Sequence, residues 1–193
     1  MQASGRRRGA WGWVGAGPAA ALLAIGTGAA GEEGATSLEK LRSARGEVRL
    51  TSWSSARTVE LDNRGSRLSV KAMTVHAPGA EAQAARGLAA AVWVQGQSEA
   101  SQTVYLDLEH AEALLRAFAQ FEKAVASALP AAGSGTTEVA YATPGGFRLR
   151  LQRGQVSQNL MVGSGLREIW CSADKLPAIK GALAGALDLL KTP

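Results

Sequence analysis

Hydrophobic and polar positions follow the same pattern twice along this 193-residue chain. Segments 104–125 and 169–190 each begin with a short apolar strand and continue into a helix with one apolar stripe. The two segments match at a fixed offset of 65 residues, which pairs Val104 with Ile169. An internal repeat of this kind indicates one supersecondary unit used twice, because a single unit leaves its apolar face uncovered. The pattern therefore predicts two related units that bury their apolar faces against each other.

A helix is expected at the end of each repeat. Apolar residues recur at helical spacing over 108–125 and again over 176–190. Asp107 and Ser172 stand just before these helices, and an acidic residue follows in each first turn. We therefore expect Asp107 and Ser172 to act as N-caps. Pro177 falls in the opening turns of its helix, where a missing amide hydrogen costs little.

A β-hairpin is predicted ahead of each repeated strand. The turns of the two hairpins, 62–65 and 143–146, contain the Asp, Asn, Pro and Gly residues that favour turns. Hairpin residues match at an offset of 80, which pairs Gly65 with Gly145, whereas the strands and helices match at 65. The difference predicts an insertion of 15 residues in the first unit. We expect it as an elaborated loop or short helix in the Ala- and Gly-rich run 78–87.

A further strand in each unit, at 88–95 and 156–162, completes the order β-β-β-β-α. The predicted fold class is α+β, with two ββββα units whose antiparallel sheets are each followed by one amphipathic helix. The two units are expected to pack as a single pseudo-duplicated domain. The predicted organisation is a signal peptide at 1–30, a polar leader at 31–56 with a short helix at 37–45 and an extra strand at 47–53, a first unit at 57–128, a connection at 129–136 and a second unit at 137–191.

The first thirty residues indicate a targeting segment. Three arginines at 6–8 precede a Gly- and Ala-rich apolar stretch, and small residues at 27–30 offer a cleavage site. A retained membrane anchor is the alternative, but it needs about 20 strongly apolar residues, and glycines dilute this stretch. A twin-arginine signal is a weaker alternative, because Gly9 and Ala10 stand where a bulky apolar residue is expected. We predict export to the periplasm or the extracellular space, with a membrane contact only through an uncleaved leader.

Removing this leader changes the charge of the chain. Its only charged residues are the three arginines, so Lys+Arg falls from 21 to 18 against 16 Asp+Glu, and the net charge falls from +5 to +2. The remaining chain of about 160 residues is long enough to bury the core of one domain. Cys171 is the only cysteine, which excludes an intramolecular disulfide. Most of the basic character belongs to the leader, and nucleic acid is therefore not the expected partner.

Side chains suited to catalysis near neutral pH are few. They are His76, His110 and Cys171, and none lies in a recognisable motif. We expect both histidines at the surface and Cys171 as a small core residue. The Gly-Ser-Gly segments 133–135 and 163–165 lack the spacing of a nucleophile elbow or a phosphate loop, and we expect turns there. No group of His, Cys and acidic residues has metal-ligand spacing, so no catalytic residue, metal or cofactor is predicted.

Strand parity indicates a candidate binding surface. Tyr105 and Trp170 are equivalent in the repeat, and each points away from the apolar residues that face the following helix. We expect Trp93 to join them, and Arg148 and Arg150 alternate in the same way on a neighbouring strand. Such a face is suited to stacking bases or sugars, or to holding an acidic partner. The alternative is that it packs against the other unit or a second subunit, with the arginines on a solvated face.

In the order of its elements, segment 57–191 resembles the whirly and PUR-type modules, in which a four-stranded sheet is followed by a helix and two units pack together. The resemblance implies binding of single-stranded nucleic acid, but the leader and the near-neutral remainder of the chain depart from that expectation. The leading prediction is an exported, non-enzymatic protein of the periplasm or cell envelope that binds through a sheet face. Its partner is unknown, with an envelope protein or a second copy of the chain as candidates. The alternative is a single-stranded nucleic-acid-binding module.

Overall fold

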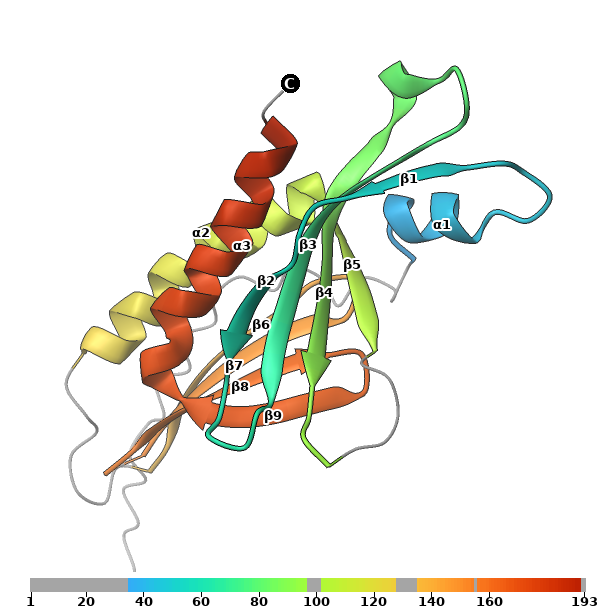
Figure 1. Ribbon diagram of the computed structural model, residues 1–193. Coiled ribbons are helices and arrows are strands. Elements are labelled where there is room, and N and C mark those ends of the chain that lie inside the picture. The colour runs from blue at the N-terminus through green and yellow to red at the C-terminus, as the bar shows by residue number, and fades with distance from the viewer. Residues whose placement is uncertain (1–34, 97–101, 128–134, 155, 192–193) are drawn as a thin grey trace, which may run out of the picture. The chain divides into compact units, whose positions relative to one another are not determined.

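Two antiparallel sheets with their helices give the chain an α+β fold (Figure 1). Two ββββα units follow each other along the chain, as the repeat predicts. The predicted leader 1–30 and residues 129–134 of the predicted connection lie outside the described residues. The computed structural model describes residues 35–96, 102–127, 135–154 and 156–191.

The first sheet precedes helix α2 (Leu108–Ala126) and has one more strand than the second. Strands β3, β4 and β5 lie side by side, and both β1 and β2 pair with the same edge of β3. A short helix, α1 (Ser37–Ser43), comes before the sheet in the chain. The strands are β1 (Leu50–Trp53), β2 (Arg57–Glu60), β3 (Arg67–His76), β4 (Ala85–Trp93) and β5 (Thr103–Asp107).

Strands β1 and β2 form one edge that is interrupted by a β-bulge. Residues 53–57 of this edge oppose residues 70–73 of β3, so the edge holds one residue more than its partner. The Ser54 amide donates to the Ala72 carbonyl at 3.0 Å, and the Ala72 amide donates to Ser54 Oγ at 2.9 Å. The hydroxyl therefore replaces a backbone acceptor where the ladder is disrupted.

The second sheet has the strand order β6-β7-β8-β9 and leads into helix α3 (Leu176–Lys191) through a 3₁₀ turn, η2 (Ala173–Lys175). Strand β5 ends at Asp107 and strand β9 ends at Ser172, so the observed boundaries keep the 65-residue offset. Its strands are β6 (Thr137–Ala142), β7 (Phe147–Arg153), β8 (Gln158–Ser164) and β9 (Arg167–Ser172).

The two units share one apolar core. The inner faces of both sheets and the apolar stripes of α2 and α3 contribute to it, including Leu106, Phe118, Leu151 and Leu183, all fully buried. Helix α3 packs on β2 and β3, while α2 packs on α3 and reaches β6 of the second unit. Burying a side chain of this size contributes about 1.5–3 kcal/mol. The shared core therefore makes the stability of each unit depend on the other.

The turns and returning strands of the two hairpins match at an odd sequence offset, not at the predicted offset of 80. Gly65, with φ +91°, matches Gly146, with φ +83°, in its left-handed backbone conformation, which gives an offset of 81. The same offset places buried Leu68 on buried Leu149. The predicted pairing of Gly65 with Gly145 is therefore wrong, because an offset of 80 would exchange the two faces of the returning strand.

The predicted insertion lies between β3 and β4. Strands β3 and β4 are longer than their counterparts β7 and β8 in the second unit. The connection between β3 and β4 contains a 3₁₀ turn, η1 (Glu81–Gln83). Strand β4 already begins at Ala85, before the predicted start of a strand at residue 88. The extra residues of 78–87 therefore form a longer hairpin with a short helical turn.

Ser164 connects the two sheets through its hydroxyl. This fully buried side chain accepts a hydrogen bond from the Val92 amide at 3.0 Å and donates one to the Gln102 carbonyl at 2.8 Å. Residues 91 and 103 are the last paired positions of β4 and β5, so the hydroxyl lies where these strands diverge. Segment 163–165 is not a turn throughout, because Ser164 is the last residue of β8.

Arg153 connects the second sheet to the end of helix α2. Its buried guanidinium donates to Ser127 Oγ at 2.6 Å and to the Ser127 carbonyl at 2.7 Å. Gln158 Nε2 donates to the Val125 carbonyl at 3.3 Å. The carbonyl end of a helix carries partial negative charge, so a cation at this position satisfies free carbonyls and stabilises the helix.

Candidate functional site

The face of the second sheet that points away from the shared core is open. Arg150, Met161 and Trp170 lie directly opposite one another on β7, β8 and β9 and form one cross-strand row. Trp170 is 45% exposed, whereas Met161 beside it is only 1% exposed. The surface named here the open face consists of Glu138, Arg148, Arg150, Gln152, Asn159, Met161, Glu168 and Trp170.

The charges of the open face cancel one another. Arg148 Nη2 lies 2.9 Å from Glu168 Oε1, and Arg150 Nε lies 3.5 Å from Glu138 Oε1. Arg148 also donates to the Gly165 carbonyl. These side chains are part-exposed, so each ion pair contributes only about 0–1 kcal/mol to stability. Their main effect is to place two arginines on the same face as Trp170 with their charges balanced by glutamates.

Gly163 makes room for one of these ion pairs. It lies directly opposite Arg148 on β7 and Glu168 on β9, so these three residues form a second cross-strand row. A Cβ at this position would lie 3.3 Å from Arg148 Nε and 3.3 Å from Glu168 Cγ. Any larger residue would push the two side chains apart, so this glycine serves close side-chain packing on the open face. The sequence predicted only a turn at this segment, whereas Gly163 belongs to strand β8.

Tyr105 occupies the equivalent position on the first sheet but is covered there. It is 6% exposed and packs with Leu38 of α1 and with Met73 in a second apolar cluster. The Arg42 guanidinium lies 5.1 Å from the centre of the tyrosine ring and donates to its hydroxyl. Tyr105 does point away from the main core, as parity predicts, but it is not accessible to a ligand in this arrangement.

The five predicted site residues do not form one surface. Trp93 and Tyr105 belong to the first sheet, where Trp93 is 40% exposed and stacks with Arg67 at 5.3 Å. Arg148, Arg150 and Trp170 belong to the second sheet and come together on the open face. The role of α1 could not be predicted from the sequence, since the periodicity of a seven-residue helix does not show which sheet it covers.

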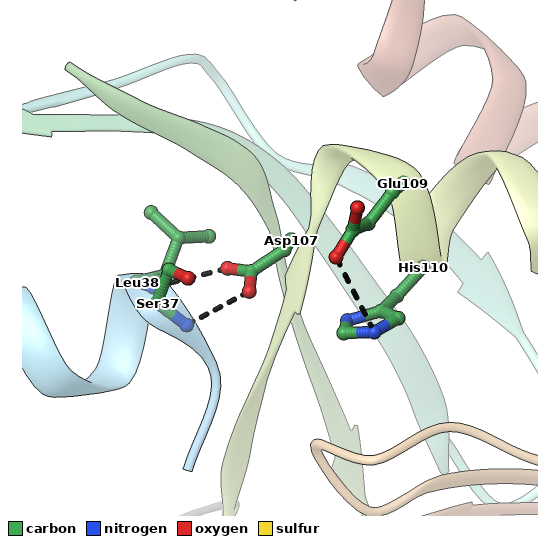
Figure 2. A network of polar contacts seen from close by, with 5 residues as sticks. All are labelled: Ser37, Leu38, Asp107, Glu109 and His110. Carbon is green, nitrogen blue, oxygen red and sulfur yellow. Dashed lines mark hydrogen bonds and ion pairs between the residues drawn. The ribbon is translucent and has the colours of Figure 1, made fainter. Parts of the chain in front are cut away.

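Asp107 caps α1 rather than α2 (Figure 2). Its carboxylate accepts hydrogen bonds from the Ser37 amide at 2.8 Å and the Leu38 amide at 3.0 Å. It stands at the N-cap position of α2 but makes no side-chain cap bond to that helix, and the same is true of Ser172 before η2. The predicted capping roles of Asp107 and Ser172 are therefore wrong. The carboxylate instead ties the start of α1 to the end of β5.

Asp107, Glu109 and His110 form the one group of three metal-binding side chains found among the described residues. Their ligand atoms lie within 4.8 Å of one another, and His110 Nε2 lies 3.8 Å from Glu109 Oε1 (Figure 2). The sequence prediction that no such group exists missed this cluster. Both Asp107 oxygens already accept hydrogen bonds from α1, and the Glu109 side chain is 80% exposed. Of the three residues, Asp107 alone contacts α1 in the interactions shown, and we therefore interpret its carboxylate as part of the attachment of α1.

Cys171 is a core residue, as predicted. It is buried, and its thiol lies 3.4 Å from the Leu160 carbonyl, to which it donates. Burial raises the pKa of the Cys171 thiol to about 11, and the negative charge of Asp174 adds to this effect. Because the thiolate is the reactive form, this cysteine is a poor nucleophile near neutral pH.

No protein-family model matches the chain, and no curated protein matches its sequence. In the described part of the chain, no helix is long and apolar enough to span a membrane.

Proposed function

We propose that this chain is an exported, non-enzymatic protein of the periplasm or cell envelope, and that it binds a partner or ligand on the open face. The observation that supports this proposal most strongly is the exposure of Trp170, which is 45% exposed and lies directly opposite buried Met161 on the open face. Tryptophan is enriched among residues that dominate binding energies, because it buries a large area at small entropic cost.

The balanced charges of the open face define the kind of contact it makes. Arg148 and Arg150 each face a glutamate, so neither presents an uncompensated positive charge. Gln152 and Asn159 add neutral hydrogen-bonding groups on the same face. A surface that combines one aromatic ring with paired polar side chains suits a contact without net charge, through stacking and hydrogen bonds.

Single-stranded nucleic acid is the alternative partner that the resemblance in element order implies. Phosphate contacts release counterions, so its affinity would fall steeply with salt. The pairing of Arg148 with Glu168 and of Arg150 with Glu138 argues against this alternative, because both arginines would have to exchange a carboxylate for a phosphate. A binding constant that changes little between low and high salt supports the proposed function over nucleic acid.

The proposed function is tested by photo-crosslinking in the cells that make the protein. Benzoylphenylalanine at Asn159, an exposed position of the open face, is compared with the same group at Gln83, an exposed position on η1. We expect an adduct of discrete mass from position 159 in the envelope fraction, none from position 83, and loss of the adduct when Trp170→Ala is added. Equal adducts from both positions, no adduct, or an adduct unaffected by Trp170→Ala would contradict the proposal.

A further inference from the structure

A groove of about 540 Å³ runs between the edge strand β2 and helix α3. All four residues of β2 form one wall, and Ala178, Gly181 and Ala182 form the helical wall, with Lys175 at one end. The groove lies on the first sheet and on α3, and it contains no residue of the open face. The two surfaces can therefore be tested independently of each other.

The outer edge of β2 has free backbone hydrogen-bonding groups. The Leu61 amide donates to the Ser66 carbonyl at 2.8 Å, which makes this pair a hydrogen-bonded position of the ladder with β3. Hydrogen-bonded and non-bonded positions alternate in antiparallel pairs, so Arg57 and Val59 bond toward β3. Thr58 and Glu60 consequently point their N–H and C=O groups away from β3. No strand of the described chain pairs with that edge.

The helical wall leaves space for an added strand. A Cβ built at Gly181 would meet no atom within 4 Å, and Ala178 beside it is exposed. A strand pairing with β2 lies about 4.8 Å from it, with alternate side chains facing α3. Residues larger than Ala178 and Gly181 would occupy that space, so this small-residue wall fits an extended chain beside β2.

The charges on the helix side of the groove are positive. Arg57 is exposed and lies over α3, with its guanidinium 2.6 Å from where a Cβ of Gly185 would be. Val59 on the same face of β2 is buried, so strand parity turns the Glu60 side chain to the opposite face. Among the described residues, Arg57 and Lys175 form no ion pair. Arg57 lies over Gly185, ten residues beyond Lys175, so the two cations are at opposite ends of the groove and Arg57 is the one that complements a carboxylate.

We propose that this groove binds an extended peptide segment of a partner protein, which adds a strand to β2 and places a carboxylate against Arg57. Strand addition supplies affinity through backbone hydrogen bonds, and the groove supplies specificity through alternate side chains. The carboxylate comes either from an acidic side chain or from the C-terminus of the peptide, since both present the same group to a guanidinium.

The experiment selects binders from a phage library of random heptapeptides with free C-termini, using the full chain as bait. Enriched peptides are synthesised with a free or an amidated C-terminus and titrated by fluorescence anisotropy. Thr58→Pro removes an outward amide that β3 does not use, and Gly181→Leu fills the groove. Thr58→Ala is the matched control, because it keeps the amide. Gly181→Leu also replaces a helical glycine, which favours folding.

We expect enriched peptides to carry a carboxylate and to bind the native chain and Thr58→Ala alike. Thr58→Pro and Gly181→Leu should each weaken peptide binding at least tenfold without lowering the melting temperature by more than a few degrees. Trp170→Ala should leave peptide binding unchanged. Arg57→Ala should remove the preference for a carboxylate. Loss of binding on amidation assigns the terminal carboxylate, and retention assigns a side chain. The proposal is overturned if no peptide is enriched over selection with Thr58→Pro, or if enriched peptides bind both blocked variants as they bind the native chain.

Discussion

Tyr105 and Trp170 stand at the same position of the repeated strand, yet Tyr105 is 6% exposed and Trp170 is 45% exposed. The difference arises because α1 covers the part of the outer face of the first sheet that surrounds Tyr105, with Leu38 packed against this tyrosine. No element of the described chain covers the corresponding face of the second sheet. The duplicated units have therefore diverged in how they use the same surface, and only the second leaves its aromatic residue available to a partner.

Replacing Asp107 with alanine should loosen α1. The substitution removes the acceptor for the Ser37 and Leu38 amides, and loss of such a cap lowers the free energy of unfolding by about 1–2 kcal/mol. Hydrogen exchange of the α1 amides should accelerate more than that of α2. Glu109→Ala is the control, because this exposed neighbour contacts only His110 among the interactions shown in Figure 2. Unchanged exchange in α1 would show that Asp107 does not hold this helix.

Ser164→Ala should destabilise both units together. It leaves the Val92 amide and the Gln102 carbonyl without their shared partner, and a buried group left unsatisfied costs roughly 1–3 kcal/mol. Urea unfolding should show a loss of about 2–3 kcal/mol in one cooperative transition. The control is Ser172→Ala, since this exposed serine makes no cap bond, and its effect should stay within about 0.5 kcal/mol. Equal, small losses for both variants would contradict the bridging role.

Cys171 should make stability fall at alkaline pH. Burial raises the pKa of Cys171 to about 11 in the folded chain, whereas the pKa of a thiol in the unfolded chain is about 8.5. The unfolded chain therefore loses its proton first, so the contribution is intact below about pH 8.5 and is lost as pH rises toward 11. Between these pH values the free energy of unfolding of the native chain should fall by up to about 1.4 kcal/mol per pH unit more than that of Cys171→Ala. Parallel stability curves for the two proteins would contradict the raised pKa.

Periodicity and the repeat were sufficient to predict the order of the elements. Val104 and Ile169 are both buried in the shared core, so the 65-residue offset correctly aligned strand and helix. The offset of 80 holds for the first strand of each hairpin, where Val59 and Val139 both face the core. It was wrong by one residue for the turn and the returning strand, because Gly145 and Gly146 are both glycines and their sequence does not show which adopts a positive φ. The backbone conformation at Gly65 and Gly146 and the burial of Leu68 and Leu149 reveal the correct match.

The candidate site was harder to predict, because it depends on contacts between distant residues. Parity placed Tyr105 and Trp170 on outer faces, but the covering of Tyr105 comes from Leu38, 67 residues earlier in the chain. Asp107 has the sequence context of a cap for α2, and its carboxylate reaches α1 only because β5 and α1 meet in the fold. Local sequence patterns do not show which residues distant in the chain come into contact.

The account depends most directly on whether the second sheet presents Trp170 as surface. The measurement that tests this is the midpoint of thermal unfolding for Trp170→Ala beside Tyr105→Ala. Truncating a buried aromatic residue costs about 3–5 kcal/mol, which in a chain of this size lowers the midpoint by roughly 10 °C. We predict such a fall for Tyr105→Ala and a change of less than about 3 °C for Trp170→Ala. A fall for Trp170→Ala as large as that for Tyr105→Ala would show that Trp170 is core and that the open face is not a binding surface.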